Sequence, residues 1–419
     1  MSGPDVRFGL EILVDSVPES RRVALRSLRF DGALLDRGLV IFFPRPESFT
    51  GEDVAELHVH GGRAVIAAVL SALGSIRGFR PAEPGEFTRR AFLNRKLDLA
   101  QVEGLADLVQ AETEAQRRQA LRQSDGEISR IVEGWRERLV RARALLEAEL
   151  DFPDEDDIPG SISEIAWADV ARMSGEIGEA LHDGHRGERL RDGAEVVLLG
   201  PPNAGKSSLL NALARRDVAI VAPEPGTTRD LIEVHLDLGG YPVTLVDTAG
   251  LREAANGVET EGIRRARARA GRADLVLWLC DLTGPRQPPP VVKGPLLRLG
   301  TKLDLIDSDE ERSRARAEFD LMLSARDGTG IEALLGRLTD FVAREFAPGE
   351  ASLITRIRHR NALTACHAAM DAALRHPELP LELRAEELRR AGDALGRISG
   401  RVEVDDLLDV IFGDFCIGK

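Results

Sequence analysis

The stretch GPPNAGKS, residues 200–207, decides the fold of this chain. It follows the apolar run EVVLL and precedes SLLNALA, so the pattern G-x-x-x-x-G-K-S stands between an expected strand and an expected helix. In that setting the glycines let the backbone curl around phosphate oxygens, Lys206 reaches the outer phosphates and the Ser207 hydroxyl holds Mg²⁺. An ordinary glycine turn is the alternative, and the strand, loop and helix order favours a phosphate-binding loop.

Four later motifs indicate the kind of nucleotide: GTTRD at 226–230, DTAG at 247–250, TKLD at 301–304 and LSAR at 323–326. GTTRD supplies the hydroxyls of Thr227 and Thr228, either of which can complete the Mg²⁺ shell when a γ-phosphate is bound, and Thr228 is the predicted ligand. Asp247 suits a water-mediated Mg²⁺ contact, and the Gly250 amide suits the γ-phosphate. Each match alone is weak, but their order and spacing together predict a GTPase domain of the Ras-like class.

The choice of base rests on Asp304. An ionised carboxylate only accepts hydrogen bonds, and guanine, unlike adenine, offers two donors on one edge. A site built on that pair rejects a base that lacks it by roughly 10⁴-fold or more, so guanine is expected. Thr301 stands where Asn is usual, and its hydroxyl can make one of the two contacts that an amide makes. The motifs give these predicted GTP-binding residues: Asn203, Ala204, Gly205, Lys206, Ser207, Ser208, Thr227, Thr228, Asp247, Thr248, Ala249, Gly250, Thr301, Lys302, Leu303, Asp304, Ser324, Ala325 and Arg326.

The water-orienting residue is not in its usual place. In many Ras-like enzymes a Gln directly after the DTAG-type motif orients the attacking water, and here that position is Leu251. The following loop offers four charged candidates, and sequence position alone does not choose among them: Arg252, Glu253, Glu259 and Glu261. As the alternative, most charges on such a loop are simply solvated.

Composition describes a cytoplasmic globular protein of two or three domains. The 419 residues are 43% hydrophobic and 30% charged, and no apolar run approaches the roughly 20 residues that span a membrane. The N-terminus lacks the apolar core of a signal peptide, and the three cysteines have no metal-type spacing, which fits a reducing compartment. A net charge of −14 argues against broad nucleic-acid binding, so contact with RNA is expected to be local or shared with a partner.

Hydrophobic periodicity divides the chain into four segments. Residues 1–96 mix strand-like runs (VRFGLEILV, RGLVIFFP and DVAELHVHGG) with one helix, RAVIAAVLSALGSI. Residues 97–190 and 347–419 have helical periodicity, while residues 191–346 alternate strand and helix patterns and carry the GTPase motifs. We expect an N-terminal α/β domain and a helical domain into which a Ras-like P-loop GTPase domain, with a mixed, mostly parallel sheet, is inserted.

Four other features receive their ordinary interpretations. His58 and His60 share a strand face without a third ligand nearby, which favours a structural role over a metal site. DFPDEDD at 151–157 lacks the spacing of a calcium loop and is interpreted as a solvated connection. RRARARAGR at 264–272 spreads its arginines round a helix, which favours a solvated face over an RNA patch. In the terminal FCIGK, the last two residues argue against prenylation of Cys416.

The chain resembles the MnmE (TrmE) family of tRNA uridine-modification GTPases along nearly its whole length: TGEDVAELHVHGG, PGEFTRRAFLNRKLDLAQVE, DFPDE, GPPNAGKSSLLNAL, GTTRD, DTAGLR and FCIGK all fit. The resemblance implies an N-terminal domain that binds folate and dimerises, a helical domain and an inserted G domain. It implies a homodimer that joins an FAD-dependent partner of the MnmG (GidA) type in a heterotetramer. Together they use GTP hydrolysis and a 5-formyl- or 5,10-methylene-tetrahydrofolate carbon to add an aminomethyl or carboxymethylaminomethyl group at C5 of the tRNA wobble uridine.

The resemblance also assigns roles to single residues. Asn203 corresponds to the family's K⁺ ligand, where the cation replaces an arginine finger once two G domains meet. Glu259 takes the water-orienting position in the spacing DTAGLR-x₆-E. Cys416 becomes the terminal cysteine needed for tRNA modification rather than GTP hydrolysis. The loop that encloses K⁺ and contacts GTP, with K⁺ ligands at Ala222, Glu224 and Thr227, falls on Ala222, Pro223, Glu224, Pro225, Gly226 and Thr227.

For folate, the resemblance points to Glu56, Lys96 and Lys419, and lysines suit the carboxylates of a folate glutamate tail. Two features depart from the family. Arg95 stands where a small or acidic residue is usual, and the chain begins just past the place where the family has a strand with a folate-contacting arginine. We therefore expect an unprotected strand edge, weak folate binding and poor dimerisation through the N-terminal domain.

Two other functions compete with this interpretation. A regulatory or ribosome-assembly GTPase switch would carry a strongly basic RNA-binding domain and would not need FCIGK, so the net acidity favours the modification enzyme. A folate-sensing protein that no longer modifies tRNA is the other alternative.

Overall fold

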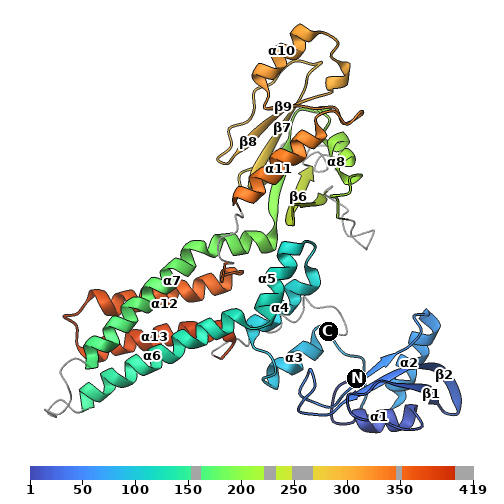
Figure 1. Ribbon diagram of the computed structural model, residues 1–419, viewed down its shortest axis with the longest axis vertical. Helices are drawn as coiled ribbons and strands as arrows, with labels where there is room; N and C mark the ends of the chain where they lie inside the picture. The colour runs from blue at the N-terminus through green and yellow to red at the C-terminus, as the bar shows by residue number, and fades with distance from the viewer. Residues whose placement is uncertain (152–161, 221–232, 248–267, 346–351, 402–419) are drawn as a thin grey trace, which may run out of the picture. The chain divides into compact units, whose positions relative to one another are not determined.

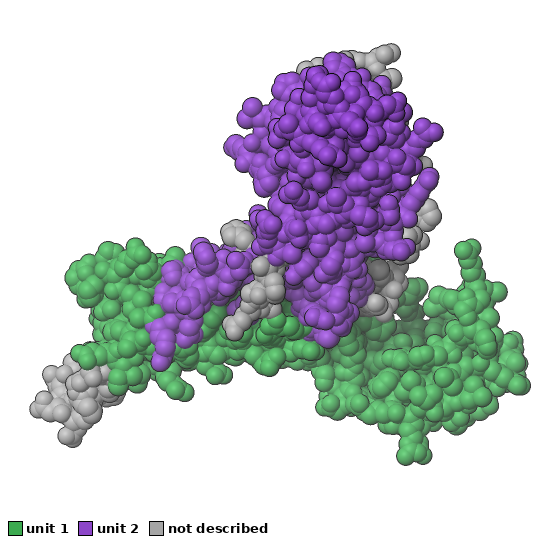
Figure 2. All heavy atoms as spheres, turned by 45° about the horizontal axis from the view of Figure 1, so that its top comes forward, with its two compact units in different colours: residues 1–106, 122–171, 368–419 green, residues 107–121, 172–367 purple. Residues whose placement is uncertain are grey.

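The computed structural model describes residues 1–151, 162–220, 233–247, 268–345 and 352–401. The chain forms two compact units, coloured green and purple in Figure 2: residues 1–106, 122–171 and 368–419, and residues 107–121 and 172–367. Each unit takes chain from before and after the GTPase motifs. The division into the four expected segments stays a prediction. Within the described ranges, no helix has both the length and the apolar character needed to cross a membrane.

The N-terminal part of the first unit is built on a three-stranded antiparallel sheet (Figure 1). Its strands are β1 (Ala24–Phe30), β2 (Ala33–Phe43) and β3 (Val54–His58), in that order, and the helix α2 (Arg63–Ser75) follows them. RGLVIFFP and DVAELHVHGG therefore form strands and RAVIAAVLSALGSI forms a helix, as predicted. In the second half of β2, every second residue is buried, and Val40 and Phe42 enter a core that includes Leu10, Leu28 and Val69.

The run VRFGLEILV is a helix, α1 (Val6–Leu13), so its interpretation as a strand was wrong. Val6, Leu10 and Leu13 are buried at a spacing of four and three residues, which is one face of a helix. A Cβ on Gly9 would lie 2.5 Å from the Phe79 ring, so this glycine allows the close approach of the two. A short apolar run fits either period, and tertiary packing decided between them.

The free edge of β3 is paired at its start, where we expected an unprotected edge. The Ala55 amide donates to the Met1 carbonyl at 3.0 Å, the Gly3 amide donates to the Asp53 carbonyl at 3.0 Å, and Ser2 bridges Val54. The Met1 amine donates to the Ala55 carbonyl at 2.8 Å. Burial lowers the pKa of this amine, and the charge of Glu56 acts in the opposite direction. That expectation was therefore wrong for this stretch of β3.

The other described residues of the first unit are mostly helical. α3 (Glu86–Leu93) and α4 (Leu99–Gln110) come first, and α6 (Glu127–Asp151) packs along α13 (Leu381–Ser399). The apolar periods of these sequences are buried, as predicted, in a core that includes Leu139, Leu146, Leu388 and Leu395. Arg384 stacks over the ring of Trp167, with 3.7 Å between the guanidinium carbon and the ring centroid.

The second unit contains a six-stranded sheet in the order β5-β6-β4-β7-β8-β9. Among the described strands, β5 and β6 pair antiparallel and the other pairs are parallel. The strands are β4 (Ala194–Leu199), β5 (Glu233–Leu238), β6 (Tyr241–Asp247), β7 (Leu275–Asp281), β8 (Leu296–Thr301) and β9 (Leu321–Met322). Three helices belong to this region: α8 (Lys206–Ala214), α10 (Asp309–Glu318) and α11 (Ile331–Glu345). β4 is buried almost throughout, as expected for a central parallel strand.

The chain that enters this sheet lies against the chain that leaves it. α7 (Ile162–Asp192) leads in, and the segment before α12 (Ile357–Arg375) leads out. α5 (Glu114–Ser124) contacts α7, because the Gln116 and Gln119 amides donate to the Arg191 and Gly187 carbonyls. A Cβ on Gly184 would lie 2.8 Å from the Ile354 side chain. Entry and exit at one place are what an inserted domain requires.

Candidate nucleotide-binding site

The phosphate-binding loop starts where β4 ends and finishes at α8. Gly200 passes so close to the Leu279 carbonyl that a Cβ there would collide with it. Gly205 has a φ of 90° and caps α8, a conformation that glycine adopts without strain. Asn203 has a φ of 63°, which Asn tolerates better than most residues, and its side chain is exposed. The close approach of Leu279 therefore explains the glycine at position 200, and backbone conformation explains the residue types at 203 and 205.

Lys206 is the buried cation of the loop, with 8% of its surface exposed. Its ammonium donates to the carbonyl oxygens of Gly200 at 2.9 Å and Pro201 at 3.0 Å. These carbonyls hold the charge against the loop. Phosphate oxygens are ionised acceptors and make stronger hydrogen bonds with an ammonium than carbonyl oxygens do. Lys206 is therefore placed to exchange its bonds with these carbonyls for bonds with phosphate oxygens.

Ser207 and Asp247 bring two motifs together. The Ser207 hydroxyl donates to Asp247 Oδ2 at 2.8 Å, and Asp247 is fully buried at the end of β6. Parallel pairing of β4 with β6 sets Leu198 opposite Asp247, which fixes the strand end beside the loop. Hydroxyl and carboxylate oxygens are the ligands that Mg²⁺ prefers, so these residues fit that cation.

Thr301 connects TKLD to the phosphate-binding loop. It is 3% exposed, and its hydroxyl lies 2.8 Å from the Ala204 carbonyl and 3.2 Å from the Cys280 carbonyl. A hydroxyl has one proton to donate, so these two carbonyls share it. The partners of this side chain in the structure are thus backbone carbonyls of the loop and of β7.

Lys302 pairs with Asp281, a residue that sequence reasoning did not single out. Lys302 Nζ lies 2.5 Å from Asp281 Oδ2, and Oδ1 accepts from the Thr283 amide at 2.9 Å and hydroxyl at 2.7 Å. Burial would raise the pKa of Asp281, but the bonds from Lys302 and Thr283 outweigh it and lower that pKa. The only signal in the sequence was an Asp directly at a strand end.

Asp304 lies on the short helical turn Leu303–Leu305 and is shielded, with 16% of its side chain exposed. Its ion-pair partner, Arg326, is 3.9 Å away and 83% exposed, so the pair is loose. The Leu303 amide donates to the Leu323 carbonyl at 3.2 Å, which brings TKLD beside LSAR. Ser324 is buried and accepts from the Arg326 amide at 3.3 Å. A shielded carboxylate with only a loose ion pair suits recognition of a base, because it can accept hydrogen bonds from the donor groups of that base.

Several predicted residues lie outside the described residues, and their roles stay predictions: Ala222, Pro223, Glu224, Pro225, Gly226, Thr227, Thr228, Thr248, Ala249, Gly250, Glu259, Cys416 and Lys419. The same holds for the other water-orienting candidates, Arg252, Glu253 and Glu261, and for the acidic run after Asp151.

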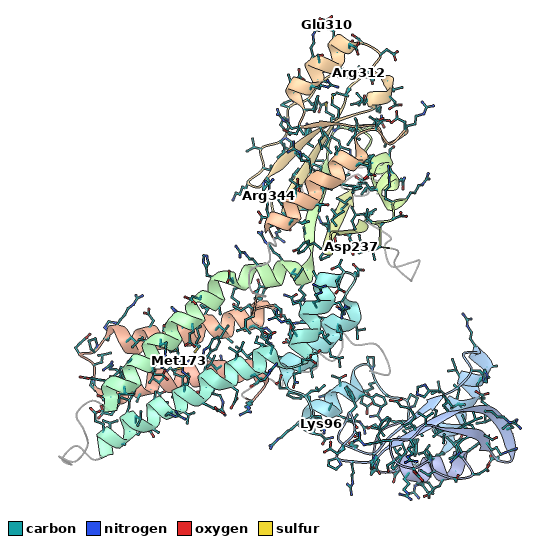
Figure 3. The ribbon with its side chains drawn as sticks, in the orientation of Figure 1. Lys96, Met173, Asp237, Glu310, Arg312 and Arg344 are labelled. Atoms are coloured by element: carbon teal, nitrogen blue, oxygen red, sulfur yellow. The ribbon has the colours of Figure 1, made fainter. Side chains whose placement is uncertain are left out.

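In the N-terminal part, the structure brings the motifs TGED and FLNRK together. A Cβ on Gly51 would lie 3.1 Å from Asn94 Cβ and 3.3 Å from Lys96 Cγ, and the Asn94 amide donates to the Thr50 carbonyl at 2.7 Å. Lys96 is exposed at this place (Figure 3). Glu56 is half exposed on β3 and lies 3.1 Å from His58 Nε2. A carboxylate and an ammonium that both face solvent fit the polar groups of a folate.

A network of charges beside TGED was missed by sequence reasoning. Arg90 lies 2.8 Å from Glu52 and 2.7 Å from Glu86, and Arg80 lies 2.7 Å from Glu86. Burial would raise the pKa of Glu86, but hydrogen bonds from Arg80, the Glu83 amide and Arg90 lower it to about 2. PGEFTRR contains two of these four residues, Glu86 and Arg90, yet nothing in its spacing distinguishes them from charges on a solvated helix.

The histidines have carboxylate partners rather than metal-type neighbours. His60 Nδ1 lies 2.9 Å from Asp36 Oδ1, and the His60 amide is the main cause that lowers the pKa of Asp36. Among the described residues, no group of three histidine, cysteine, aspartate or glutamate side chains is arranged to hold a metal ion. Of the run RRARARAGR, Arg269 is held in ion pairs with Glu195 and Glu233, so it belongs neither to a solvated face nor to an RNA patch.

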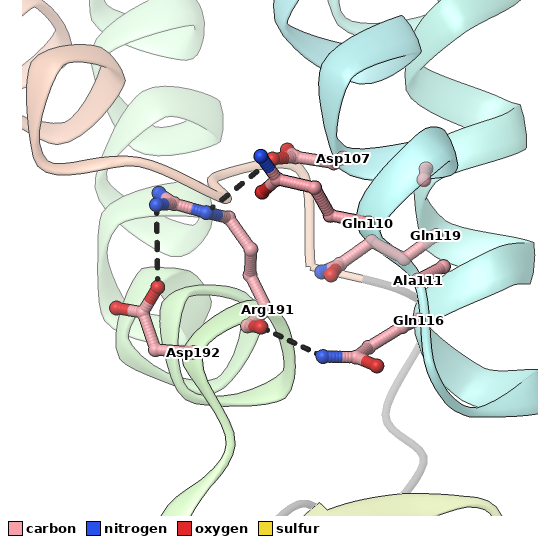
Figure 4. Close-up of a pocket in the computed structure, with 8 residues that line it drawn as sticks. Asp107, Gln110, Ala111, Gln116, Gln119, Arg191 and Asp192 are labelled. Carbon is pink, nitrogen blue, oxygen red and sulfur yellow. Dashed lines mark hydrogen bonds and ion pairs between the residues drawn. The ribbon is translucent and has the colours of Figure 1, made fainter. Parts of the chain in front are cut away.

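A polar pocket of about 140 Å³ lies between the corner of α4 and α5 and the end of α7 (Figure 4). Arg191 on its wall lies 3.5 Å from Asp107, and the Gln116 amide donates to the Arg191 carbonyl at 2.9 Å. Arg356 also pairs with Asp107, at 2.6 Å. These contacts hold the end of α7 in place, which gives the pocket a structural role.

Relatives of similar length match over the whole chain. The tRNA modification GTPase MnmE of Mesorhizobium japonicum is 54% identical over 421 residues, which cover 100% of this chain and 95% of that protein. The proteins of the same name from Rhizobium johnstonii and Parvibaculum lavamentivorans are 54% and 53% identical; they cover 100% of this chain, and 94% and 95% of their own lengths are matched. Among solved structures, the G domain of the T. maritima FeoB iron transporter covers 35% of this chain and 98% of its own, at 24% identity and a TM-score of 0.26.

Two family models account for nearly the whole length. The model described as the GTP-binding protein TrmE N-terminus matches residues 1–96, and the model described as the MnmE helical domain matches residues 99–416. These matches confirm the resemblance carried by the motifs, and with the sheet and loop described above they confirm the expected fold class. The chain belongs to the MnmE (TrmE) family of tRNA modification GTPases.

Proposed function

We propose that this protein is a GTP-hydrolysing enzyme of tRNA modification. With an FAD-dependent partner of the MnmG type, it adds an aminomethyl or carboxymethylaminomethyl group at C5 of the wobble uridine and takes the carbon from a tetrahydrofolate derivative. The observation that carries the proposal is the match, over 100% of the chain at 54% identity, to a protein named tRNA modification GTPase MnmE. The glycine-rich loop that holds Lys206 and the shielded carboxylate of Asp304 support the proposal.

In the GTP site, Lys206 neutralises the outer phosphates and Asp304 selects guanine. Ser207 and Thr228 are the residues that would hold Mg²⁺, which when bound would offset charge on the phosphate oxygens. Glu259 orients the attacking water in place of the missing Gln.

Replacing Asp304 with Asn should lower GTP affinity sharply and favour xanthosine nucleotides, because an amide can donate where the oxygen at C2 of xanthine accepts. Unchanged GTP binding by this variant would contradict the assignment.

Two G domains of a homodimer pair during hydrolysis, and Asn203, Ala222, Glu224 and Thr227 would hold K⁺ at the site. K⁺ when bound would supply the positive charge that an arginine finger supplies in other GTPases. The exposed side chain of Asn203 at the loop supports this role. Turnover should therefore be fast in K⁺, slow in Na⁺ and steeply dependent on protein concentration. Glu259→Ala should lower turnover by roughly 10²-fold or more without loss of nucleotide binding. Equal rates in the two salts would count against the cation mechanism.

The N-terminal part binds folate through Glu56, Lys96 and Lys419. The adjacency of Gly51 and Lys96 supports a shared surface for the two motifs. Calorimetric titration of the full chain with 5-formyltetrahydrofolate tests this role, with Lys96→Ala as the weakened variant and Lys293→Ala, in the G domain, as its control. A charge-assisted bond is worth about 1.5–3 kcal/mol, or about 10- to 150-fold in affinity. Equal affinity in the wild type and Lys96→Ala would remove Lys96 from the site.

Cys416 serves the tRNA reaction and not GTP hydrolysis. Cys416→Ser should keep GTPase activity and lose modification, and parallel loss of both would assign the tail a structural role.

Mass spectrometry of wobble uridines in a strain lacking the protein decides between the proposed tRNA-modification function and a ribosome-assembly or folate-sensing role. Unmodified C5 positions in that strain support the enzyme, and fully modified ones contradict it.

A further inference from the structure

The ion-pair cluster around Arg269 has no part in the nucleotide contacts described above. Arg269 Nε lies 3.0 Å from Glu195 Oε1, and its Nη2 lies 3.1 Å from Glu195 Oε2 and 3.0 Å from Glu233 Oε1. The three side chains are 27%, 35% and 24% exposed, so the cluster is partly shielded from solvent. A two-pronged Arg to carboxylate pair is stronger and more directional than a single contact. This cluster is therefore not an ordinary surface salt bridge.

The cluster stands where two functional segments rejoin the sheet. Glu233 is the first residue of β5, directly after the segment that carries Thr228. Arg269 lies on the helical turn 268–270, directly after the segment that carries Glu259. Ala270 packs with Val197 and Val246, which seats this turn on the sheet. The Arg269 guanidinium thus connects the residues that follow the two segments, Glu233 after the first and Arg269 itself after the second.

The cluster also continues toward α7. The Glu195 amide donates to Asp274 Oδ2 at 2.9 Å, and Asp274 Oδ1 lies 3.7 Å from Arg189. Arg189, near the end of α7, lies 2.5 Å from Glu345 at the end of α11. The ends of the two segments are therefore fixed to β4 and, through Asp274, to the helix that enters the G domain.

We propose that Arg269 is a positioning residue for GTP hydrolysis, which holds the ends of the segments bearing Thr228 and Glu259 in one register on the sheet. The inference rests on the proposed roles of those two residues. Hydrolysis needs both segments at the same phosphate, and a displacement of about 1 Å costs roughly 10²-fold in rate. Nucleotide binding depends on the phosphate-binding loop and TKLD, so it does not need the contacts of Arg269 with Glu195 and Glu233.

The test compares two arginine variants in the full-length protein. Arg269→Met removes the charge and keeps the length of the side chain. Arg286→Met is the matched control, since Arg286 also pairs with a glutamate, Glu318, and stacks over Phe319, and neither partner adjoins the two segments in the chain. We expect kcat for GTP in K⁺ to fall about 10- to 100-fold in Arg269→Met, with KM and GDP affinity unchanged, and no change in Arg286→Met. An unchanged kcat in Arg269→Met would overturn the proposal.

A second variant isolates the tie between the segments. Glu233→Gln leaves the pair between Arg269 and Glu195 in place and weakens only the link to β5, so kcat should fall several-fold. If Glu233→Gln turns over like the wild type, or if Arg269→Met loses GDP affinity and thermal stability in step with kcat, the role is structural and the proposal is wrong. Lack of GTP hydrolysis in the wild type would instead refute the proposed function.

Discussion

Thr301 shows what a single hydroxyl does at the nucleotide site. It donates to buried carbonyls of Ala204 and Cys280, so Thr301→Val would leave these acceptors without that donor. An unsatisfied buried polar group costs about 1–3 kcal/mol, and the free energy of unfolding should fall by that amount. GDP affinity should fall too, because Ala204 belongs to the phosphate-binding loop. Thr301→Ser keeps the hydroxyl and is the control. Denaturant unfolding and GDP titration of both variants measure the effect, and equal values for Val and Ser would contradict it.

Glu86 should make the first unit sensitive to acid. Its pKa is about 2 in the folded chain, below the ordinary value of 4.5, because the hydrogen bonds from Arg80, the Glu83 amide and Arg90 overcome the opposing effect of burial. A carboxyl with a lowered folded pKa contributes stability above its unfolded pKa, and this contribution is lost as the pH falls toward the folded pKa. The loss should therefore occur between pH 4.5 and about 2.

The comparison of Glu86→Gln with the wild type across this pH range measures that contribution. The thermal midpoints of the two proteins should differ at neutral pH and converge below pH 4.5. Glu19→Gln is the control, because the pair of Glu19 with Arg22 is exposed on both sides. A constant difference between wild type and Glu86→Gln at every pH would refute the electrostatic explanation.

At the scale of elements, α7 depends on glycines at its contact with the returning chain. A Cβ on Gly187 would collide with the Ile354 carbonyl and lie 2.8 Å from the Ser352 hydroxyl. Gly187→Ala should therefore destabilise the protein by about 1–3 kcal/mol, as overpacking does. Gly175, on the same helix, has open space around its Cα, so Gly175→Ala should stabilise by about 0.5–1 kcal/mol. Urea unfolding of the two variants measures both, and shifts of the same sign would contradict this account of the contact.

At the scale of the whole molecule, the parts of the chain before and after the six-stranded sheet should fold without that sheet. Arg191 Nη1 lies 3.5 Å from the Thr355 carbonyl, and Asp107 pairs with Arg356 at 2.6 Å, so the two ends meet outside the sheet. Replacement of residues 194–351 by a short Gly/Ser linker should leave a protein that keeps the three-stranded sheet and the helices, with cooperative thermal unfolding. Circular dichroism provides the measurement. A non-cooperative transition would mean that the helices depend on the sheet and that the G domain is not an independent insertion.

Local patterns were enough to predict much of the site. Gly200, Gly205 and Lys206 were identified correctly as a loop between a strand and a helix, because backbone conformation and chain direction there depend on neighbouring residues. The long helices were equally predictable, since apolar residues at a helical period must share one face. VRFGLEILV failed because a run this short carries no decisive period, and the packing of Leu10 and Gly9 settled it.

By itself, the sequence determined the loop between β4 and α8 and the family, since each is carried by short motifs of contiguous residues, and it predicted a guanine-selecting role for Asp304. Only the tertiary structure decided the partners of Thr301, Lys302 and Arg269. Their contacts join residues far apart in the chain, and the strand order β5-β6-β4-β7-β8 sets which side chains meet. An arginine in RRARARAGR has the same local chemistry as its neighbours. Its role follows from the two carboxylates that the sheet places within reach.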